Sequence, residues 1–355
     1  MKNLIRNSVL IFVIFFSISC SSVYEKIYPT LTDGKYDSEF PYNNSSQQLE
    51  QISKSIKLLN SVAFYTGYVF GPDTKFSKPD LKNMDFEKHA IEKVYFNRTS
   101  SGTATLIYSD QDKIGLLSVA HIVNYPDTIV SYFVNSDGSF SKYIQSISIK
   151  SRQSNFAPDL PNNGELDIIL MDKINDIAVL GMKTNPSESL PLTKFEYPWG
   201  KSNELEWGSF VYVFGFPMNY KMVSKGIVSK GAKEKNGFLI DAVFNKGYSG
   251  GIVLAIRDGV PNFELVGLVR SVPAEYEYTI RPLSREHDID YNPMIPYKGD
   301  LYVDKQQTLR IGITKVIGIE QVIEFFQKNK DALLNKGYFF SQFYPSGTTK
   351  VEIIR

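Results

Sequence analysis

A long succession of short apolar segments, each bounded by Gly, Pro, Asn or Asp, most constrains the fold of this chain. Segments of this length that are rich in Val, Ile, Phe and Tyr predict β-strands joined by turns. Many short strands in one chain favour a β-barrel or a β-sandwich. We expect strands at residues 104–108, 114–119, 128–133, 144–150, 168–172, 178–183, 210–214, 223–229, 237–241, 252–257, 264–270 and 309–315.

The segments outside this succession are less regular. Residues 45–59 carry apolar side chains at helical spacing, and residues 62–70 resemble a strand. A short helix is expected at 80–92 and a C-terminal helix at 319–326. Residues 273–305 are polar and aromatic, which predicts an inserted loop.

These patterns predict one main domain with additions at both ends. We assign residues 20–93 to a tether and N-terminal extension, 94–330 to the main domain and 331–355 to a C-terminal tail.

The composition limits the classes of function. The chain has 355 residues, of which 43% are hydrophobic, enough to bury one large core or two modest ones. A formal net charge of +1 gives no electrostatic reason to expect a nucleic-acid partner. His287, Asp288 and Asp290 have metal-binding side chains, but a solvated loop is the simpler interpretation. We expect no metal and no cofactor.

The N-terminus is interpreted as a targeting segment. Lys2 and Arg6 precede an apolar run at 9–18 that is too short to span a bilayer comfortably. The run ends just before Cys20, and this arrangement resembles a bacterial lipoprotein signal. The resemblance implies that 1–19 is a cleaved signal peptide and that a lipid on Cys20 anchors the protein to a membrane of the cell envelope. An ordinary secretory signal with an incidental cysteine is the alternative.

A glycine-rich turn at residues 245–253, Asn-Lys-Gly-Tyr-Ser-Gly-Gly-Ile-Val, is the segment with the clearest chemical use. Glycine permits a tight turn, which can expose the Ser249 hydroxyl and direct backbone N–H groups into the same space. A nucleophile beside an oxyanion hole has this arrangement. Taken alone, the pattern also fits an ordinary turn between strands.

Two upstream residues complete a possible catalytic set. His121 follows the apolar segment Leu-Ser-Val-Ala, and Asp176 precedes the apolar segment Ile-Ala-Val-Leu. An acid can orient an imidazole, which can take a proton from a serine while N–H groups stabilise the developing oxyanion.

These pieces resemble the trypsin-like (chymotrypsin-fold) serine peptidases, in which the catalytic residues occur in the order His, Asp, Ser. The more specific resemblance is to the protease domain of the bacterial HtrA/Do type, without a following PDZ-like domain. It rests on the strings at 206–208, 213–217, 224–229, 241–245 and 311–314. The resemblance covers roughly residues 94–330 and implies insertions near 135–165 and 273–305. It also implies two six-stranded antiparallel β-barrels with the site in the cleft between them.

The resemblance also assigns roles to residues. His121 is the general base and acid, Asp176 orients it, and Ser249 is the nucleophile. The backbone N–H groups of Gly247 and Ser249 form the oxyanion hole. Val243 lies at the base of the substrate pocket, which implies a preference for small or medium apolar side chains.

The chain departs from the family pattern at Tyr248, which replaces the usual Asn or Asp before the serine. The sequence therefore predicts an exported serine endopeptidase acting on polypeptides through an acyl-enzyme. The alternative is an inactive protease-like scaffold that binds a cell-envelope partner, with residues 273–305 as its interface or as a block over the cleft. Oligomeric state and substrate remain open at this point.

Overall fold

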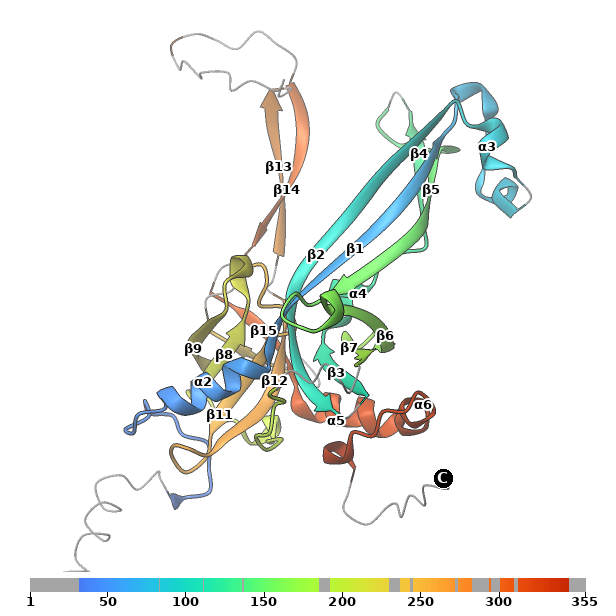
Figure 1. The fold of residues 1–355 in the computed structure, drawn as a ribbon. Helices are drawn as coiled ribbons and strands as arrows, with labels where there is room; N and C mark the ends of the chain where they lie inside the picture. The colour runs from blue at the N-terminus through green and yellow to red at the C-terminus, as the bar shows by residue number, and fades with distance from the viewer. Residues whose placement is uncertain are drawn as a thin grey trace, which may run out of the picture.

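The protein consists mainly of two closed six-stranded antiparallel β-barrels. Figure 1 shows how they are arranged in the chain. The computed structural model describes residues 32–82, 84–110, 112–135, 137–184, 192–229, 237–242, 245–271, 274–282, 294, 301–309 and 312–344. The predicted fold class, a double β-barrel with a C-terminal helix, is confirmed. None of the helices within these ranges is long and apolar enough to cross a bilayer.

The first barrel is built from the N-terminal half of the chain. Its strands follow one another in the order β1 (Ile56–Val69), β2 (Glu92–Ser109), β3 (Lys113–Ser118), β7 (Ile177–Lys183), β6 (Glu165–Asp172) and β5 (Phe140–Phe156). Pairing of β1 with β5 closes the ring, and β4 (Thr128–Val134) pairs with β5 outside it.

The second barrel follows directly. Its strand order is β10 (Gly237–Ile240), β15 (Thr314–Gly318), β12 (Phe263–Ser271), β11 (Ile252–Ile256), β8 (Phe210–Gly215) and β9 (Met222–Ser229), closed by pairing of β10 with β9. The strand expected at 309–315 is wrong in its bounds, because one strand ends at Leu309 and β15 begins only at Thr314. Gly312 lies between them with φ +108°.

One apolar core joins the two barrels. Its fully buried members include Leu106 and Leu116 of the first barrel and Phe214 and Leu254 of the second. The C-terminal helix α5 (Ile319–Lys328) adds Phe326, and α6 (Lys330–Asn335) follows it. Because burial of apolar surface is the main driving force of folding, this shared core fixes the two barrels to one another.

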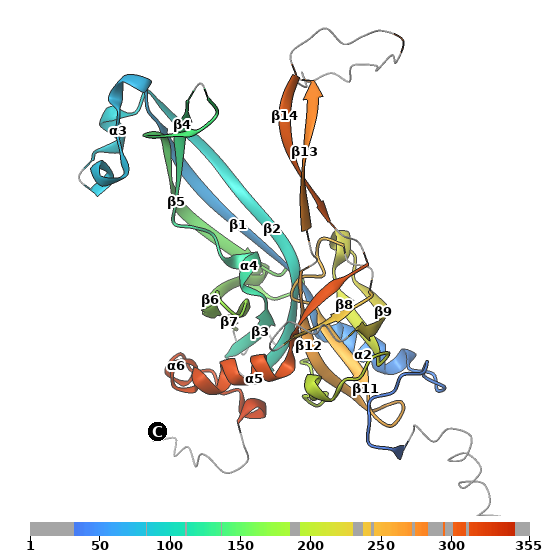
Figure 2. The same ribbon diagram turned by 180° about the vertical axis from the view of Figure 1, so that it is seen from behind.

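Two β-arms rise from the barrels on the same side of the molecule in both views (Figures 1 and 2). The first arm is the extension of β1, β2 and β5, together with β4 and the short helix α3 (Phe86–His89) at its tip. The second is an antiparallel hairpin of β13 (Ala274–Pro282) and β14 (Leu301–Leu309). The expectation of an irregular loop at 273–305 is therefore wrong for these two segments.

The N-terminal region also differs from expectation. Helix α2 (Ser46–Ser55) is shorter than the predicted 45–59, and the chain then enters β1, a full member of the first barrel. The barrel thus takes its first strand from the segment before residue 94 that the sequence assigned to an extension. The remaining short helices are α4 (Ala120–Val123), η2 (Pro72–Thr74), η3 (Lys78–Lys82), η4 (Asn162–Gly164), η6 (Ser202–Glu204), η7 (Pro217–Asn219) and η8 (Ser341–Phe343).

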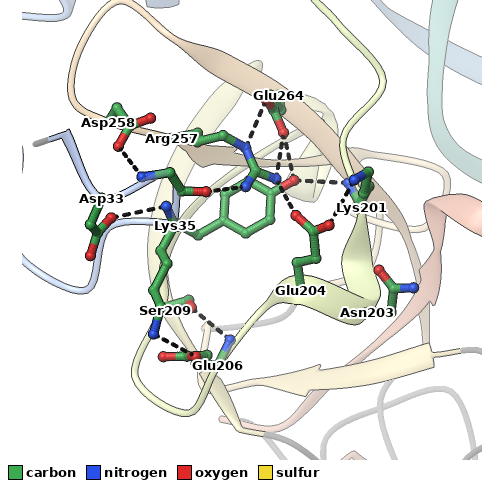
Figure 3. Close-up of polar contacts among 12 residues, drawn as sticks. Asp33, Lys35, Lys201, Asn203, Glu204, Glu206, Ser209, Arg257, Asp258 and Glu264 are labelled. Carbon is green, nitrogen blue, oxygen red and sulfur yellow. Dashed lines mark hydrogen bonds and ion pairs between the residues drawn. The ribbon is translucent and has the colours of Figure 1, made fainter. Parts of the chain in front are cut away.

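A polar network fixes the segment before α2 to the second barrel. Arg257 lies at its centre, with Nη1 donating to the Gly34 carbonyl at 2.6 Å and Nε donating to Glu264 at 3.1 Å. The Tyr36 ring stacks under the Arg257 guanidinium at 4.0 Å, and its hydroxyl donates to Glu264 at 2.6 Å. Figure 3 shows Arg257, Glu264 and Asp258 converging on this segment. The segment that precedes the first barrel in the sequence is therefore attached to the second barrel.

Candidate active site

His121 lies on α4, immediately after β3. Its neighbours Ala120 and Ile122 are buried in the core, whereas the His121 side chain is 42% exposed. The β3 residue Ser118 donates its hydroxyl to the Thr103 carbonyl of β2 at 2.6 Å. The apolar strand before the histidine thus anchors the backbone and leaves the imidazole at the surface.

Asp176 occupies the turn between β6 and β7 and has φ +60°, a backbone conformation that Asp tolerates better than most residues. Its Oδ2 lies 2.8 Å from His121 Nδ1, and its Oδ1 accepts the His121 backbone N–H at 2.8 Å. The Asp176 side chain is only 9% exposed. When Nδ1 donates to this carboxylate, Nε2 is left unprotonated and able to accept a proton.

Ser249 lies in the tight turn that precedes β11. This turn requires glycine at positions 247 and 250. Gly247 has φ +110° and Gly250 has φ +80°. A Cβ at Gly247 would lie 2.1 Å from the Phe216 carbonyl oxygen, and one at Gly250 would lie 2.2 Å from the Thr103 oxygen. No side chain fits at either position without moving backbone.

The serine turn is bonded to the first barrel through Thr103 of β2. The Thr103 N–H donates to the Ser249 carbonyl at 2.8 Å, and the Thr103 hydroxyl donates to the Gly247 carbonyl at 2.7 Å. β2 is the neighbour of β3, and β3 leads to His121. The hydrogen bonds to Thr103 therefore hold the serine turn against the barrel that carries His121.

The hydroxyl of Ser249 is not bonded to His121. Among the residues that the structure describes, its hydrogen bond goes to the carbonyl of Arg270, at 3.3 Å. The Arg270 guanidinium in turn places Nε 3.5 Å from Asp176 Oδ2. One residue of β12 therefore contacts both the serine and the aspartate.

Sequence reasoning missed Arg270. The available signal was a cation at the end of the otherwise apolar segment Leu-Val-Gly-Leu-Val. Such a charge needs a partner or solvent, but the sequence does not show that the partner is Asp176.

The N–H groups of Gly247 and Ser249 have no hydrogen-bond acceptor within the described ranges. The carbonyl of Lys246 accepts the Met218 N–H at 3.0 Å, and the carbonyl of Tyr248 accepts the Gly251 N–H at 2.8 Å. In a trans peptide the N–H points opposite to the carbonyl, so both amides are directed away from these contacts. They are available to bind a negatively charged oxygen.

Tyr248, the departure before the serine, points into the second barrel. It is buried among Val213, Val253 and neighbouring apolar residues, and its hydroxyl is hydrogen-bonded to Ser224. Burial raises the pKa of the Tyr248 phenol above its usual value. The large side chain is therefore accommodated in the core beside the turn.

Other predicted sites fall outside the described residues. Val243, at the expected base of the substrate pocket, and Cys20, the expected lipidation site, lie there. Within the described ranges, no group of three or more His, Cys, Asp or Glu side chains is placed to hold a metal ion.

Comparison with known proteins adds one finding. Residues 102–268 match the family described as trypsin-like peptidase domain, a range that contains His121, Asp176 and Ser249. No curated protein matches the chain.

Proposed function

Because residues 102–268 match a trypsin-like peptidase domain, we propose that the chain is a serine endopeptidase with His121, Asp176 and Ser249 as its catalytic triad. The observation that carries this proposal is the Asp176–His121 pair, joined at 2.8 Å, on the barrel to which the Ser249 turn is bonded through Thr103. The family and the fold together support a function of the serine-protease type acting on polypeptides.

The proposed reaction begins with a rotation of the Ser249 side chain from the Arg270 carbonyl toward His121. Rotation about χ1 exchanges staggered rotamers without moving the backbone. His121 Nε2 then takes the hydroxyl proton as Oγ attacks the peptide carbonyl carbon. The tetrahedral intermediate collapses when His121 gives this proton to the leaving amine, and an acyl-enzyme remains on Ser249.

Water completes the cycle. His121 takes a proton from a water molecule, whose oxygen attacks the acyl carbon, and the proton returns to Ser249 as the carboxylic acid leaves. In both halves the substrate oxygen becomes negatively charged. The unbonded N–H groups of Gly247 and Ser249 are the proposed donors to it.

Finer assignments rest on sequence alone. We infer an HtrA/Do-type domain from the strings that resemble that family, and a preference for small or medium apolar side chains from Val243. The segment at 1–20 supports export and lipid attachment at Cys20 on the cell envelope, with secretion without a lipid as the alternative.

One observation favours a second candidate, a protease-like scaffold that cuts nothing. The Ser249 hydroxyl is bonded to Arg270 and not to His121. A resting site that never exchanges this bond would bind a partner without hydrolysing it.

Hydrolysis of fluorescein-labelled casein separates the two functions. An endopeptidase releases labelled peptides with the wild-type chain and none with Ser249→Ala. The scaffold releases none with either chain, although both bind the labelled casein. Equal release by both chains would remove Ser249 from the mechanism.

A further inference from the structure

Within the described part of the chain, one edge of β2 has no partner strand over most of its length. β2 pairs with β1 from Glu92 to Thr105, but it pairs with β3 only from Thr105 to Ser109. From Lys93 to Ser101 no strand within the described ranges covers the second edge. We call this segment the β2 edge.

The backbone groups of the β2 edge that face outward can be identified from Thr103. The Thr103 N–H donates to Ser249, which lies on the side away from β1. In an antiparallel strand, the N–H and C=O of alternate residues point to the same side, and the β1–β2 register is free of bulges. The outward N–H and C=O groups therefore belong to Lys93, Tyr95, Asn97, Thr99 and Ser101.

These groups are accessible. Every residue from Glu92 to Thr99 is exposed, including Tyr95 at 71%. At about 3.3 Å per residue, the β2 edge extends for about 30 Å. Long unprotected edges are uncommon in soluble proteins, because they pair readily with other extended chains.

The β2 edge leads directly to the candidate nucleophile. Gly102 follows it, and a Cβ at Gly102 would lie 2.8 Å from the Ser249 carbonyl oxygen. The β2 edge therefore ends beside the serine turn. The other end lies in the first arm, which rises on the same side of the barrels as the β13–β14 hairpin (Figures 1 and 2).

We propose that the β2 edge binds an extended segment of the polypeptide substrate as an added β-strand, an inference that rests on the proposed endopeptidase function. Main-chain hydrogen bonds would supply affinity without demanding one sequence. A second copy of this protein is a less suitable occupant, since pairing along the whole edge would also cover the approach to Ser249.

The first test removes one outward donor. Asn97→Pro deletes an N–H that faces outward, so the hydrogen bonds between β1 and β2 remain. Proline is tolerated in edge strands at positions of this kind. The matched variant Asn97→Ala removes the same side chain and keeps the N–H. Both are made in Ser249→Ala, so that binding of fluorescein-labelled casein, followed by anisotropy, does not depend on hydrolysis. We expect the proline variant to bind casein at least threefold more weakly than the alanine variant.

The second test needs no substitution on the β2 edge. Amide hydrogen exchange is measured in Ser249→Ala with and without casein. Exchange should slow at least tenfold at Tyr95, Asn97 and Thr99, while Phe96 and Arg98, already bonded to β1, change little. Such alternation would also keep the proposal testable if Asn97→Pro fails to fold.

Three results would overturn the proposal. They are equal casein binding by the two Asn97 variants, unchanged exchange at the outward amides, and a dimer in size-exclusion chromatography that only Asn97→Pro dissociates. Casein binding with the alternating protection but no hydrolysis by the wild-type chain would instead contradict the endopeptidase function and leave the strand-binding edge.

Discussion

The two barrels hold their halves of the site in different states. In the first barrel, Asp176 accepts two hydrogen bonds from His121, and the imidazole is already oriented. In the second, the Ser249 turn is held by its backbone, but the hydroxyl is bonded to Arg270. The Ser249 turn is also bonded to Thr103 of the first barrel, so its backbone is fixed from both sides. The proposed catalytic step depends on one further contact, between the Ser249 hydroxyl and His121.

The imidazole of His121 is thus already oriented, whereas the Ser249 hydroxyl is not yet in position to react with it. In the proposed mechanism, the first barrel supplies a base that needs no rearrangement, whereas the second supplies a nucleophile that must exchange one hydrogen bond. Substitutions in the two halves should therefore have unequal effects on rate and stability.

Removing the nucleophile should have the largest effect. Ser249→Ala leaves the Thr103 anchor and the His121–Asp176 pair in place but has no hydroxyl to acylate. We expect kcat for casein to fall by about 10⁶, the size of loss seen when a serine nucleophile is removed from a related mechanism. Ser131→Ala, at an exposed position on β4, is the control and should retain wild-type turnover.

Changing the acid should have the next largest effect. Asp176→Asn preserves the shape of the side chain but offers an N–H to His121, which selects the tautomer with its proton on Nε2. We expect kcat to fall by about 10⁴, with the casein affinity of the variant unchanged. A loss smaller than tenfold would mean that the first barrel does not set the tautomer of the base.

The free energy of unfolding should depend on pH through Asp37, which is bonded to the second barrel. Asp37 is bonded to it through the Gly259 N–H at 3.1 Å, and only 8% of the residue is exposed. Burial, with smaller contributions from the carboxylates of Glu39 and Asp258, raises the Asp37 pKa from 3.8 to about 6. The folded state therefore binds this proton more tightly than the unfolded state, so the free energy of unfolding falls as pH rises between these values.

Asp37→Asn tests this pH dependence because the amide stays neutral and can still accept a hydrogen bond from the Gly259 N–H. We expect the variant to be more stable than wild type at pH 7 by on the order of 1–2 kcal/mol, with no difference at pH 3. Urea unfolding at both pH values measures it. An unchanged slope of stability against pH would contradict this account.

Arg270 should contribute least. Its ion pair with Asp176 is long, at 3.5 Å, and 45% of the Arg270 side chain is exposed. Such pairs contribute roughly 0.2–1 kcal/mol, and we expect Arg270→Gln to lower the free energy of unfolding by that amount. A loss above about 3 kcal/mol in urea unfolding would show instead that the Asp176 charge depends on Arg270.

The sequence predicts where strands occur better than it predicts where they begin and end. The alternation in β1 is hidden because its buried positions include the small residues Ser61 and Ala63 beside Leu59 and Tyr65. Residues 56–59 also continue the apolar spacing of α2, so the helix was predicted too long. The β13–β14 hairpin projects from the barrel, and its apolar side chains Tyr278 and Ile280 are exposed, so these two residues do not mark a buried face.

The site follows the same rule. His121, Asp176 and Ser249 each lie in a local motif that the sequence displays. Their mutual contacts, and the place of Arg270 between the serine and the aspartate, depend on which strands meet across the barrels. No local pattern records that pairing.

The central claim is that His121 makes Ser249 reactive across the barrel boundary. The most direct measurement is the rate of covalent labelling by a fluorophosphonate, followed by intact mass, in wild type and in His121→Ala. The account predicts a single adduct on Ser249 in wild type and labelling slowed by at least 10³ in the variant. Equal labelling rates, or an adduct on another residue, would contradict it.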